Sequence, residues 1–282
     1  MADADATIGV SYPPAHHVLR SLGYGVEHRP DLTSTAHLSV GPHLLGGTGE
    51  VTTGALATLV DATGGGLAAL AARPDWIATA GLTLHLLAPV RAGAVTAEGR
   101  VVRRGRTTVV LAVDLIVDAG RPVGTATMTF AILPRRDTNP VMAPLDAPVR
   151  HEFRPLDDAH LAGLAAAIGI EVGPDSIRAP MSPFVVNTLG AMQGGVVAML
   201  IAGAATTAAD RIIGEPTVCV DLAIDYLALA KHGPVRAEAR VLRTGSDWAQ
   251  FEVEVRDEGG DDRRTALARA VAVRVGTPGA ER

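Results

Sequence analysis

One stretch of the sequence decides the fold: Gly49-Glu50-Val51-Thr52-Thr53-Gly54-Ala55-Leu56-Ala57-Thr58-Leu59-Val60-Asp61. It returns later in the chain as Gly190-Ala191-Met192-Gln193-Gly194-Gly195-Val196-Val197-Ala198-Met199-Leu200-Ile201-Ala202. Gly49 aligns with Gly190 and Gly54 aligns with Gly195, both at an offset of 141 residues. A self-match at a fixed offset indicates a repeated structural unit. The sequence therefore predicts two copies of one fold.

The alignment continues beyond this segment at an offset of 140, as in Leu82 with Leu222, so the second copy has lost one residue. Alternating or β-branched runs, separated by turns rich in Gly, Pro and Arg, predict antiparallel strands after the helix in each copy. Short helices are predicted ahead of the copies, at 16–22 and 158–168. The predicted strands are 82–87, 94–103, 107–117 and 123–133 in the first copy, and 218–229, 235–242, 249–256 and 265–275 in the second.

The segment from Gly54 to Ala72 is apolar on nearly every side, which is typical of a helix enclosed by other elements. At 1.5 Å per residue it would span roughly 28 Å, enough to cross the concave face of a curled sheet. Its Gly64-Gly65-Gly66 run weakens a helix by about 1 kcal/mol per glycine, so we expect another backbone or a thin ligand to approach there. We predict an α+β fold with two antiparallel sheets, each wrapped around a central apolar helix.

Prolines between the copies indicate a linker. The predicted division is an N-terminal domain at 1–137, a Pro-rich linker at 138–150 and a C-terminal domain at 151–282.

Composition and charge argue against several classes of function. A net charge of −5 and an aromatic content of 3% disfavour nucleic acid as a partner. The apolar stretches are interrupted before the roughly 20 residues of a membrane span, and the acidic N-terminus does not read as a signal peptide. We therefore expect a cytoplasmic protein with no membrane partner. A single cysteine, Cys219, and scattered histidines give no metal-ligand pattern.

The two copies share a frame but differ in their polar residues. Where the first copy has Asp61, the second has Ala202. Asn187 and Gln193 of the second copy correspond to Gly46 and Thr52 of the first. Asp61 is the only charged residue between Val51 and Ala72, and burying a carboxylate in apolar surroundings is costly unless it is paired or functional. This asymmetry is where we expect the function to lie.

Asn187, Gly190, Gly194 and Gly195 form the pattern Asn-x-x-Gly-x-x-x-Gly-Gly, which resembles the entrance of the central helix in PaaI-like hotdog thioesterases. In that family a His or Gln precedes the Gly-Gly pair, as Gln193 does here. An acidic residue also follows seven positions after the second glycine, and the step from Gly54 to Asp61 has this spacing. The resemblance covers nearly the whole chain as two hotdogs in tandem. It implies an acyl-CoA thioesterase that needs no cofactor, coenzyme A being part of the substrate, and a homo-oligomer of such chains.

In the family, two hotdog subunits pair, and each active site combines the helix start of one with the helix acid of the other. Here the resemblance implies one complete composite site, which joins Asp61 of the first copy with Asn187, Gln193, Gly194 and Gly195 of the second. The other combination joins Gly46, Thr52 and Thr53 with Ala202 and contains no acid.

Thioester hydrolysis needs a polarised carbonyl and an activated water or nucleophile. Unpaired N–H groups at the helix start, beside Gly194 and Gly195, can hold a developing oxyanion. Asp61 could act as a general base or attack directly to form a mixed anhydride, while Asn187 and Gln193 would orient water or the carbonyl. Structural roles fit the same residues: Asp61 as a solvent-facing or capping residue, Asn187 in a turn, and Gln193 as a helix cap.

The cluster Arg103, Arg104 and Arg106 lies in a predicted turn, where a solvated charge run is the ordinary interpretation. In a hotdog thioesterase it could also contact the phosphates of coenzyme A.

Other functions are ranked below thioester hydrolysis. The main alternative is a catalytically silent acyl-CoA or acyl-carrier binding protein of the same fold, because half of the site residues are lost. A hotdog dehydratase would call for an Asp-His pair, and no histidine lies near Asp61 in the sequence. Dinucleotide binding and a serine-hydrolase elbow are disfavoured, because the third glycine of Gly-x-Gly-x-x-Gly falls on Thr52 and Gly-x-Ser-x-Gly does not occur.

Overall fold

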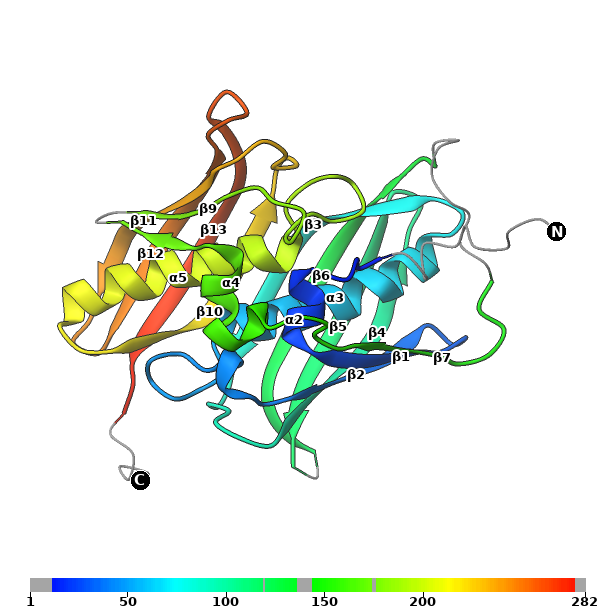
Figure 1. The fold of residues 1–282 in the computed structure, drawn as a ribbon, viewed down its shortest axis with the longest axis horizontal. Coiled ribbons are helices and arrows are strands. Elements are labelled where there is room, and N and C mark those ends of the chain that lie inside the picture. Colours follow the sequence, from blue (N-terminus) through cyan, green and yellow to red (C-terminus); the bar gives the residue numbers. More distant parts are fainter. Residues whose placement is uncertain (1–11, 119, 136–143, 174–175, 277–282) are drawn as a thin grey trace.

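A computed structural model describes residues 12–118, 120–135, 144–173 and 176–276. Its two long helices, α3 (Thr53–Ala72) and α5 (Gly194–Ile213), lie along one face of a curved antiparallel sheet (Figure 1). The described residues place thirteen strands in this sheet, in the order β7-β1-β2-β4-β5-β6-β3-β10-β13-β12-β11-β9-β8. The order is nearly symmetric about the β3–β10 pair, as expected for two copies of one unit.

The elements of the two copies correspond closely. The first copy holds α2 (Val18–Leu22), β1 (Tyr24–His28), β2 (Thr33–Ser39), the 3-10 helix η1 (Pro42–Leu44), β3 (Trp76–Leu86), β4 (Ala94–Arg104), β5 (Thr108–Val117) and β6 (Arg121–Leu133). After β7 (Val149–Phe153), the second holds the 3-10 helix η2 (Ala159–Ala162), α4 (Leu164–Ile168), β8 (Glu171–Val172), β9 (Ser176–Ala179), β10 (Thr217–Tyr226), β11 (Val235–Thr244), β12 (Trp248–Asp257) and β13 (Arg263–Arg274).

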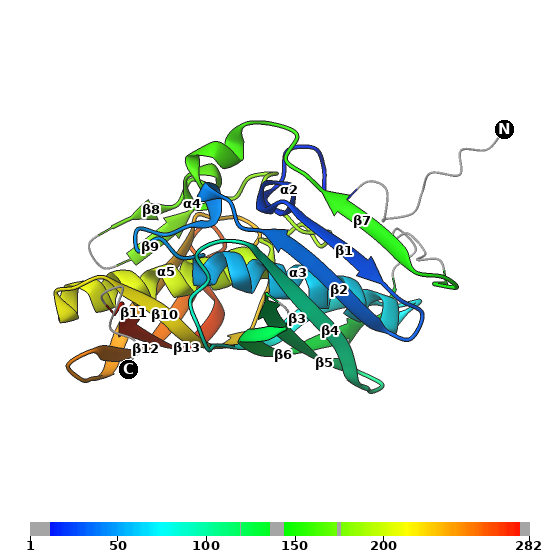
Figure 2. The same cartoon turned by 90° about the horizontal axis from the view of Figure 1, so that it is seen from below.

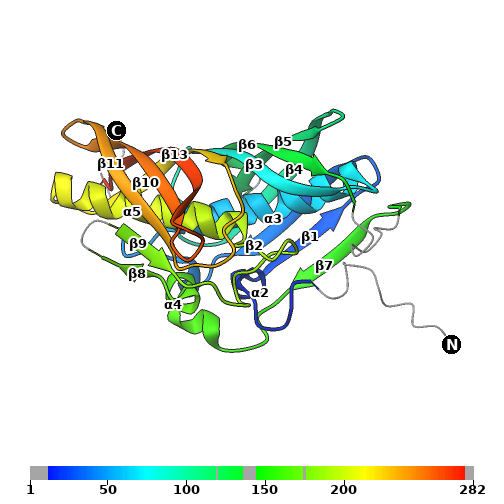
Figure 3. The ribbon, with the colours of Figure 1, turned by 90° about the horizontal axis from the view of Figure 1, so that it is seen from above.

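The two predicted sheets meet edge to edge and form one continuous sheet. β3 pairs antiparallel with β10, and Leu84 lies opposite Leu222 in this pair. Each half curls around its own helix, so that β1, β2 and β7 lie across α3 from β3, β5 and β6 (Figure 2). Seen from the opposite side, α3 and α5 overlap at the middle of the molecule (Figure 3).

α3 is enclosed because its apolar side chains point to all sides. Leu56, Leu59, Val60 and Leu67 are each at most 2% exposed. α3 and α5 are long and apolar enough to span a membrane by length and composition, contrary to the expectation from the apolar runs. However, 72% and 56% of their apolar windows are buried inside the protein, as in the core helices of a folded domain. The two helices are thus weak evidence for a membrane span.

The glycines in the middle of α3 make room for side chains, where the sequence predicted a backbone or a thin ligand. A Cβ atom on Gly64 would lie 2.6 Å from the Met128 sulfur. A Cβ on Gly66 would lie 2.7 Å from the His28 ring. A Cβ on Gly65 would meet no other atom within 4 Å, and this glycine lines a cavity. The helix therefore keeps glycines so that β6 and β1 can pack closely and a cavity can open between them.

β7 spans the end of the predicted linker and the start of the predicted second domain, but it belongs to the sheet of the first copy. It pairs antiparallel with β1, and Val26 lies opposite His151. Residues 149–153, divided by the prediction between the linker and the second domain, therefore extend the first half of the sheet and wall in α3. Of the predicted linker, residues 138–143 lie outside the described residues.

Candidate functional site

The site forms where the N-terminal halves of α3 and α5 touch. A Cβ atom on Gly54 would lie 2.5 Å from Cγ of Met199, and one on Gly195 would lie 2.5 Å from Cα of Thr58. These contacts leave no room for a side chain at either glycine. The close approach brings the start of α5 against the second turn of α3, one turn before Asp61.

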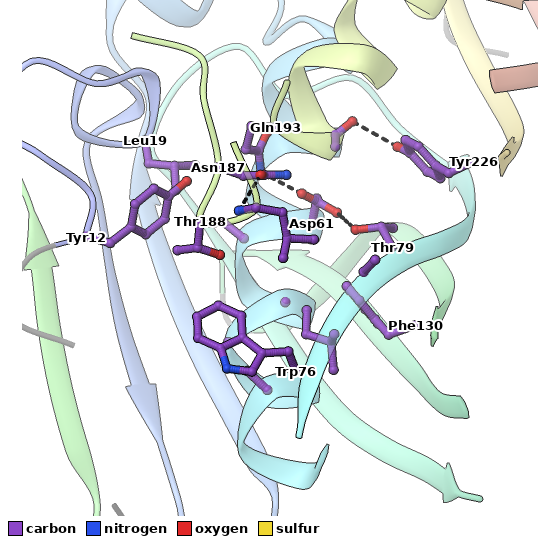
Figure 4. Close-up of a pocket in the computed structure, with 18 of the residues that line it drawn as sticks. Tyr12, Leu19, Asp61, Trp76, Thr79, Phe130, Asn187, Thr188, Gln193 and Tyr226 are labelled. Atoms are coloured by element: carbon purple, nitrogen blue, oxygen red, sulfur yellow. Dashed lines mark hydrogen bonds between the residues drawn. The ribbon is translucent and has the colours of Figure 1, made fainter. Parts of the chain in front are cut away.

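The Asp61 carboxylate receives hydrogen bonds from both copies. Nε2 of Gln193 donates to Oδ2 at 2.5 Å, and the N–H of Gly195 donates to the same oxygen at 3.2 Å. Oγ1 of Thr79, on β3, donates to Oδ1 at 3.1 Å. Figure 4 shows Asp61 held between Gln193 and Thr79. A Cβ on Gly194 would lie 2.9 Å from Oδ1, so this glycine leaves the space beside the carboxylate open.

Burial perturbs the acid strongly. Asp61 is 5% exposed, and this desolvation raises its pKa from the ordinary 3.8 to about 6, against the lowering effect of its hydrogen bonds from Thr79, Gly195 and Gln193. The carboxyl group is therefore mostly ionised at neutral pH and is more basic than an exposed aspartate. A pKa near the working pH is what general-base chemistry requires.

The Gln193 amide is engaged at both ends. Its Oε1 accepts the N–H of Val196 at 3.0 Å, so Gln193 is the N-cap of α5 as well as a partner of Asp61. The first-turn N–H of Gly195 is also taken, by Asp61. The described residues supply no hydrogen-bond partner for the N–H of Gly194. Of the two glycine donors predicted for an oxyanion, only that of Gly194 is open.

Asn187 shapes the loop that leads into α5. Its Oδ1 accepts the N–H groups of Leu189 at 2.9 Å and of Ala191 at 3.2 Å, the pattern of a turn residue. The residue lines the cavity beside Asp61, but its carbonyl oxygen is committed to the loop. The structure thus gives Asn187 the turn role that the sequence left open as an alternative.

Two polar partners at the site were not predicted from the sequence. Besides Thr79, the hydroxyl of the partly buried Tyr226 donates to the carbonyl oxygen of Gly194 at 2.8 Å. Burial, followed by the charge of Asp61, raises the pKa of Tyr226 well above its ordinary value, so this hydroxyl keeps its proton. At the offset of 140, Thr79 and Tyr226 correspond to Cys219 and Leu86, so the asymmetry that singled out Asp61 could have found both.

Tyr226 and Asp61 bind opposite ends of one peptide group. The Gly194 carbonyl accepts from Tyr226, and the N–H of the same peptide, on Gly195, donates to Asp61. Hydrogen bonds in such a chain polarise one another. Tyr226 therefore orients and strengthens the donor that holds the carboxylate.

The corresponding position in the other copy contains no acid. Ala202 is buried, and the hydroxyl of Thr53 donates to the Cys219 carbonyl at 2.5 Å. Thr52 caps α3 by accepting the N–H of Ala55 at 3.3 Å, as Gln193 caps α5. A pocket of about 200 Å³ remains beside the 86–91 loop. This half keeps the frame of the site without its titratable group.

A cavity of about 740 Å³ opens beside Asp61. Its volume is within the range of about 300–1,000 Å³ typical of small-molecule sites. Its walls come from α3, the inner faces of β1 and β7, the ends of β3 and β6, and the 187–194 and 226–230 segments. Most of the lining is apolar, with Asp61 at one wall. Such a space suits a largely apolar ligand with a polar group at the Asp61 wall.

The arginine cluster lies away from this cavity lining. Nε of Arg104 donates to the Ala71 carbonyl at 2.6 Å, at the last turn of α3. Arg103 and Arg106 are exposed. Contact with coenzyme A phosphates stays a prediction for these residues. Among the described residues, no group of three or more His, Cys, Asp or Glu side chains could hold a metal ion.

Comparisons with known proteins agree with this fold. The fold and the site define a class of protein: a double hotdog with a buried acid, Asp61, between its two central helices. The model of the thioesterase superfamily matches residues 49–123 and 189–263, which is more than half of the chain. The chain belongs to this superfamily, and the two matches are its two copies. A comparison with curated proteins gives no match.

Several solved structures share the fold over most of their length. An acyl-ACP thioesterase from Bacteroides thetaiotaomicron is 14% identical, with a TM-score of 0.58 over 86% of this chain and 98% of that one. The 12:0-ACP thioesterase from Umbellularia californica is 10% identical, with a TM-score of 0.59 over 86% and 94%. A protein of unknown function with a hot dog fold from Alicyclobacillus acidocaldarius is 13% identical, with a TM-score of 0.53 over 86% and 94%. At these identities the likeness shows the fold alone.

Proposed function

We propose that the protein is an acyl-CoA thioesterase that hydrolyses its substrate to a free acid and coenzyme A at one composite site per chain. The observation that carries the proposal is the buried Asp61 carboxylate of one copy, hydrogen-bonded to Gln193 and Gly195 of the other at the wall of the 740 Å³ cavity. Superfamily membership supports thioester hydrolysis as the reaction.

The substrate carbonyl oxygen lies at the N–H of Gly194 in this proposal. This donor is at the start of α5, where the helix dipole favours negative charge. As the carbonyl carbon becomes tetrahedral, its oxygen gains charge and the hydrogen bond strengthens, which lowers the barrier. The absence of a side chain on Gly194 lets the thioester approach both this donor and Asp61.

Asp61 supplies the second half of the chemistry by one of two routes. As a general base, it takes a proton from water while the water oxygen attacks the carbonyl carbon; the C–S bond then breaks, and the proton goes to the leaving thiolate. As a nucleophile, its carboxylate oxygen attacks the carbon and releases the thiolate, and water hydrolyses the resulting mixed anhydride. Single turnover in 18O-labelled water identifies the nucleophilic route if label appears in Asp61, because only attack of water on the aspartyl carbon of the anhydride places it there.

The proposed function is tested by the release of free coenzyme A from a series of acyl-CoA substrates, with the same acyl groups on an acyl carrier protein as a parallel series. We expect turnover of acyl-CoA that Asp61→Asn abolishes. Turnover of the carrier series alone would show that the substrate is an acyl carrier protein thioester and not an acyl-CoA. Binding of acyl-CoA without turnover of either series would show instead a silent binding protein of the same fold.

The contact with coenzyme A phosphates is tested separately. Arg103→Ala with Arg106→Ala removes two of the three exposed arginines and leaves Arg104, whose hydrogen bond to the Ala71 carbonyl stabilises α3. We expect a higher KM for acyl-CoA that is less sensitive to salt, because exposed charges are screened within about 8 Å at physiological ionic strength. An unchanged KM would assign the cluster to the solvated surface.

A further inference from the structure

The far part of the cavity contains a histidine that the proposed chemistry does not use. His28, the last residue of β1, lines the cavity and is 8% exposed. Its Nδ1 is buried and has no hydrogen-bond partner among the described residues. Buried polar groups are nearly always partnered, so an unpartnered one in a ligand cavity calls for an explanation.

The ring is positioned by the helix it faces. A Cβ on Gly66 would lie 2.7 Å from both Cε1 and Nε2 of His28, so this edge of the ring rests on α3 where the side chain is missing. Gly66 also lines the cavity. At the offset of 141, Gly66 corresponds to Thr207, so the second copy does not keep the glycine that admits the ring. The packing of His28 on Gly66 is therefore found in the first copy, which also has the cavity and Asp61.

The helix α3 and the strand β1 both give an approximate distance from the Asp61 end of the cavity to His28. Asp61 and Gly66 are five residues apart on α3, or about 7.5 Å along the axis. Tyr24 and His28, which both line the cavity, are four residues apart on β1, or about 13 Å. An extended carbon chain advances about 1.3 Å per atom, given a C–C bond of about 1.5 Å. The histidine is therefore reached about six to ten carbons from the thioester carbonyl.

We propose that the acyl group carries an uncharged oxygen substituent, a hydroxyl or an oxo group, about six to ten carbons from the thioester, and that His28 binds it. The inference rests on the proposed thioesterase function and names the class of acyl group. Val26, Ala69 and Phe130 make most of the nearby wall apolar, and the polar side chains that a substituent at this depth would meet are the buried His28 and, beside it, the more exposed His151.

The ring is uncharged at neutral pH, which selects the kind of oxygen group. Burial, followed by repulsion from His151, lowers the pKa of His28 to about 4. The His28 and His151 ring centroids lie 6.4 Å apart. A neutral imidazole donates through one nitrogen and accepts through the other, so it can bind a hydroxyl or an oxo oxygen. A carboxylate at this depth would be buried without a positive partner, which disfavours it.

The test compares dodecanoyl-CoA, 3-hydroxydodecanoyl-CoA and 8-hydroxydodecanoyl-CoA as substrates. The three acyl chains have the same length, and only the last places oxygen at the depth of His28. Wild type, His28→Leu and His28→Gln are compared, with His37→Leu as the matched control. His37 is an exposed histidine on the neighbouring strand β2, where its Nδ1 pairs with Oγ1 of Thr96 at 3.0 Å.

We expect wild type to have at least a tenfold higher kcat/KM for the 8-hydroxy substrate than for the other two. His28→Leu should remove this preference while retaining turnover of dodecanoyl-CoA, His28→Gln should keep part of it, and His37→Leu should keep all of it. Equal kcat/KM for the three substrates in wild type would overturn the inference, even if a variant fails to fold. So would a preference that survives in His28→Leu.

Failure of the proposed function gives a different result. If wild type hydrolyses none of the three substrates, the thioesterase proposal fails for this class of acyl-CoA. Calorimetric titration with non-hydrolysable thioether analogues of the same three compounds still decides the role of His28. Tighter binding of the 8-hydroxy analogue, lost in His28→Leu, supports the binding site, and equal binding of all three overturns it.

Discussion

Replacing the acid at the helix junction should make the protein more stable at neutral pH. Asp61→Asn keeps the shape of the side chain but removes a buried charge. The Asn carboxamide can still accept from Gln193 and Gly195 through its oxygen, and its NH2 group can donate to the Thr79 hydroxyl, which rotates to accept. The variant therefore isolates the energy of ionising this group inside the protein.

The magnitude follows from the pKa. Burial raises the Asp61 pKa from 3.8 to about 6, so at 1.36 kcal/mol per pH unit, ionisation costs the folded state about 3 kcal/mol. Because the folded state holds this proton more tightly than the unfolded chain, the stability it gives is fully present below about pH 3.8 and is lost as the pH rises through about 6. About 1.4 kcal/mol of the change lies between pH 5 and pH 8.

The assay is urea unfolding of wild type and Asp61→Asn at pH 5 and pH 8, followed by circular dichroism. We expect the stability of the variant relative to wild type to increase by about 1.4 kcal/mol from the lower to the higher pH. Asp225→Asn, on the exposed side of β10, is the control for loss of a carboxylate. A relative stability that is the same at both pH values, or that falls toward pH 8, would refute the buried-acid argument.

Three further outcomes follow from the site. In wild type, kcat/KM should rise with pH through about 6 and then level off, because the proposed mechanism uses the ionised form of Asp61; a rate independent of pH between 5 and 8 would contradict this. Tyr226→Phe should move this rise in kcat/KM to higher pH, because it weakens the Gly195 donor that holds the carboxylate. An unchanged pH profile would show that Tyr226 contributes only packing. Gln193→Ala and Thr52→Ala both remove a helix N-cap worth about 1 kcal/mol, but only the first should lower kcat, by at least tenfold, in steady-state assays; equal kcat losses would contradict the single-site model.

The repeated segment and the strand pattern predicted most of the architecture, because hydrophobic periodicity depends on local sequence. The prediction 94–103 became Ala94–Arg104, and 107–117 became Thr108–Val117. β7 was missed because its partner, β1, lies more than 100 residues earlier, and five residues at the junction of the predicted linker and second domain show no periodicity that identifies such a pairing. The same strand carries one wall of the cavity, so the cavity could not be predicted either.

Within the candidate site, residue types were easier to predict than their hydrogen bonds. The resemblance placed Asp61 beside Gln193 and Gly195, and the structure brings these residues together. It did not show that Asp61 would occupy the Gly195 N–H, since this depends on how closely α3 and α5 cross. That crossing is set by the contacts of Gly54 with Met199 and of Gly195 with Thr58, which are tertiary distances.

The energy of the buried acid also accounts for the difference between the two copies. A symmetric chain would hold a second buried carboxylate at the position of Ala202, and each ionised group would lower stability by about 3 kcal/mol at neutral pH. Marginal stabilities of about 5–15 kcal/mol make a second such loss substantial. In the half that has Ala202, Thr79 and Tyr226 are replaced by Cys219 and Leu86, and the space beside them is about 200 Å³ instead of about 740 Å³. The half without the acid thus also lacks its polar partners and has the smaller pocket, and the second copy presents the start of α5 to Asp61.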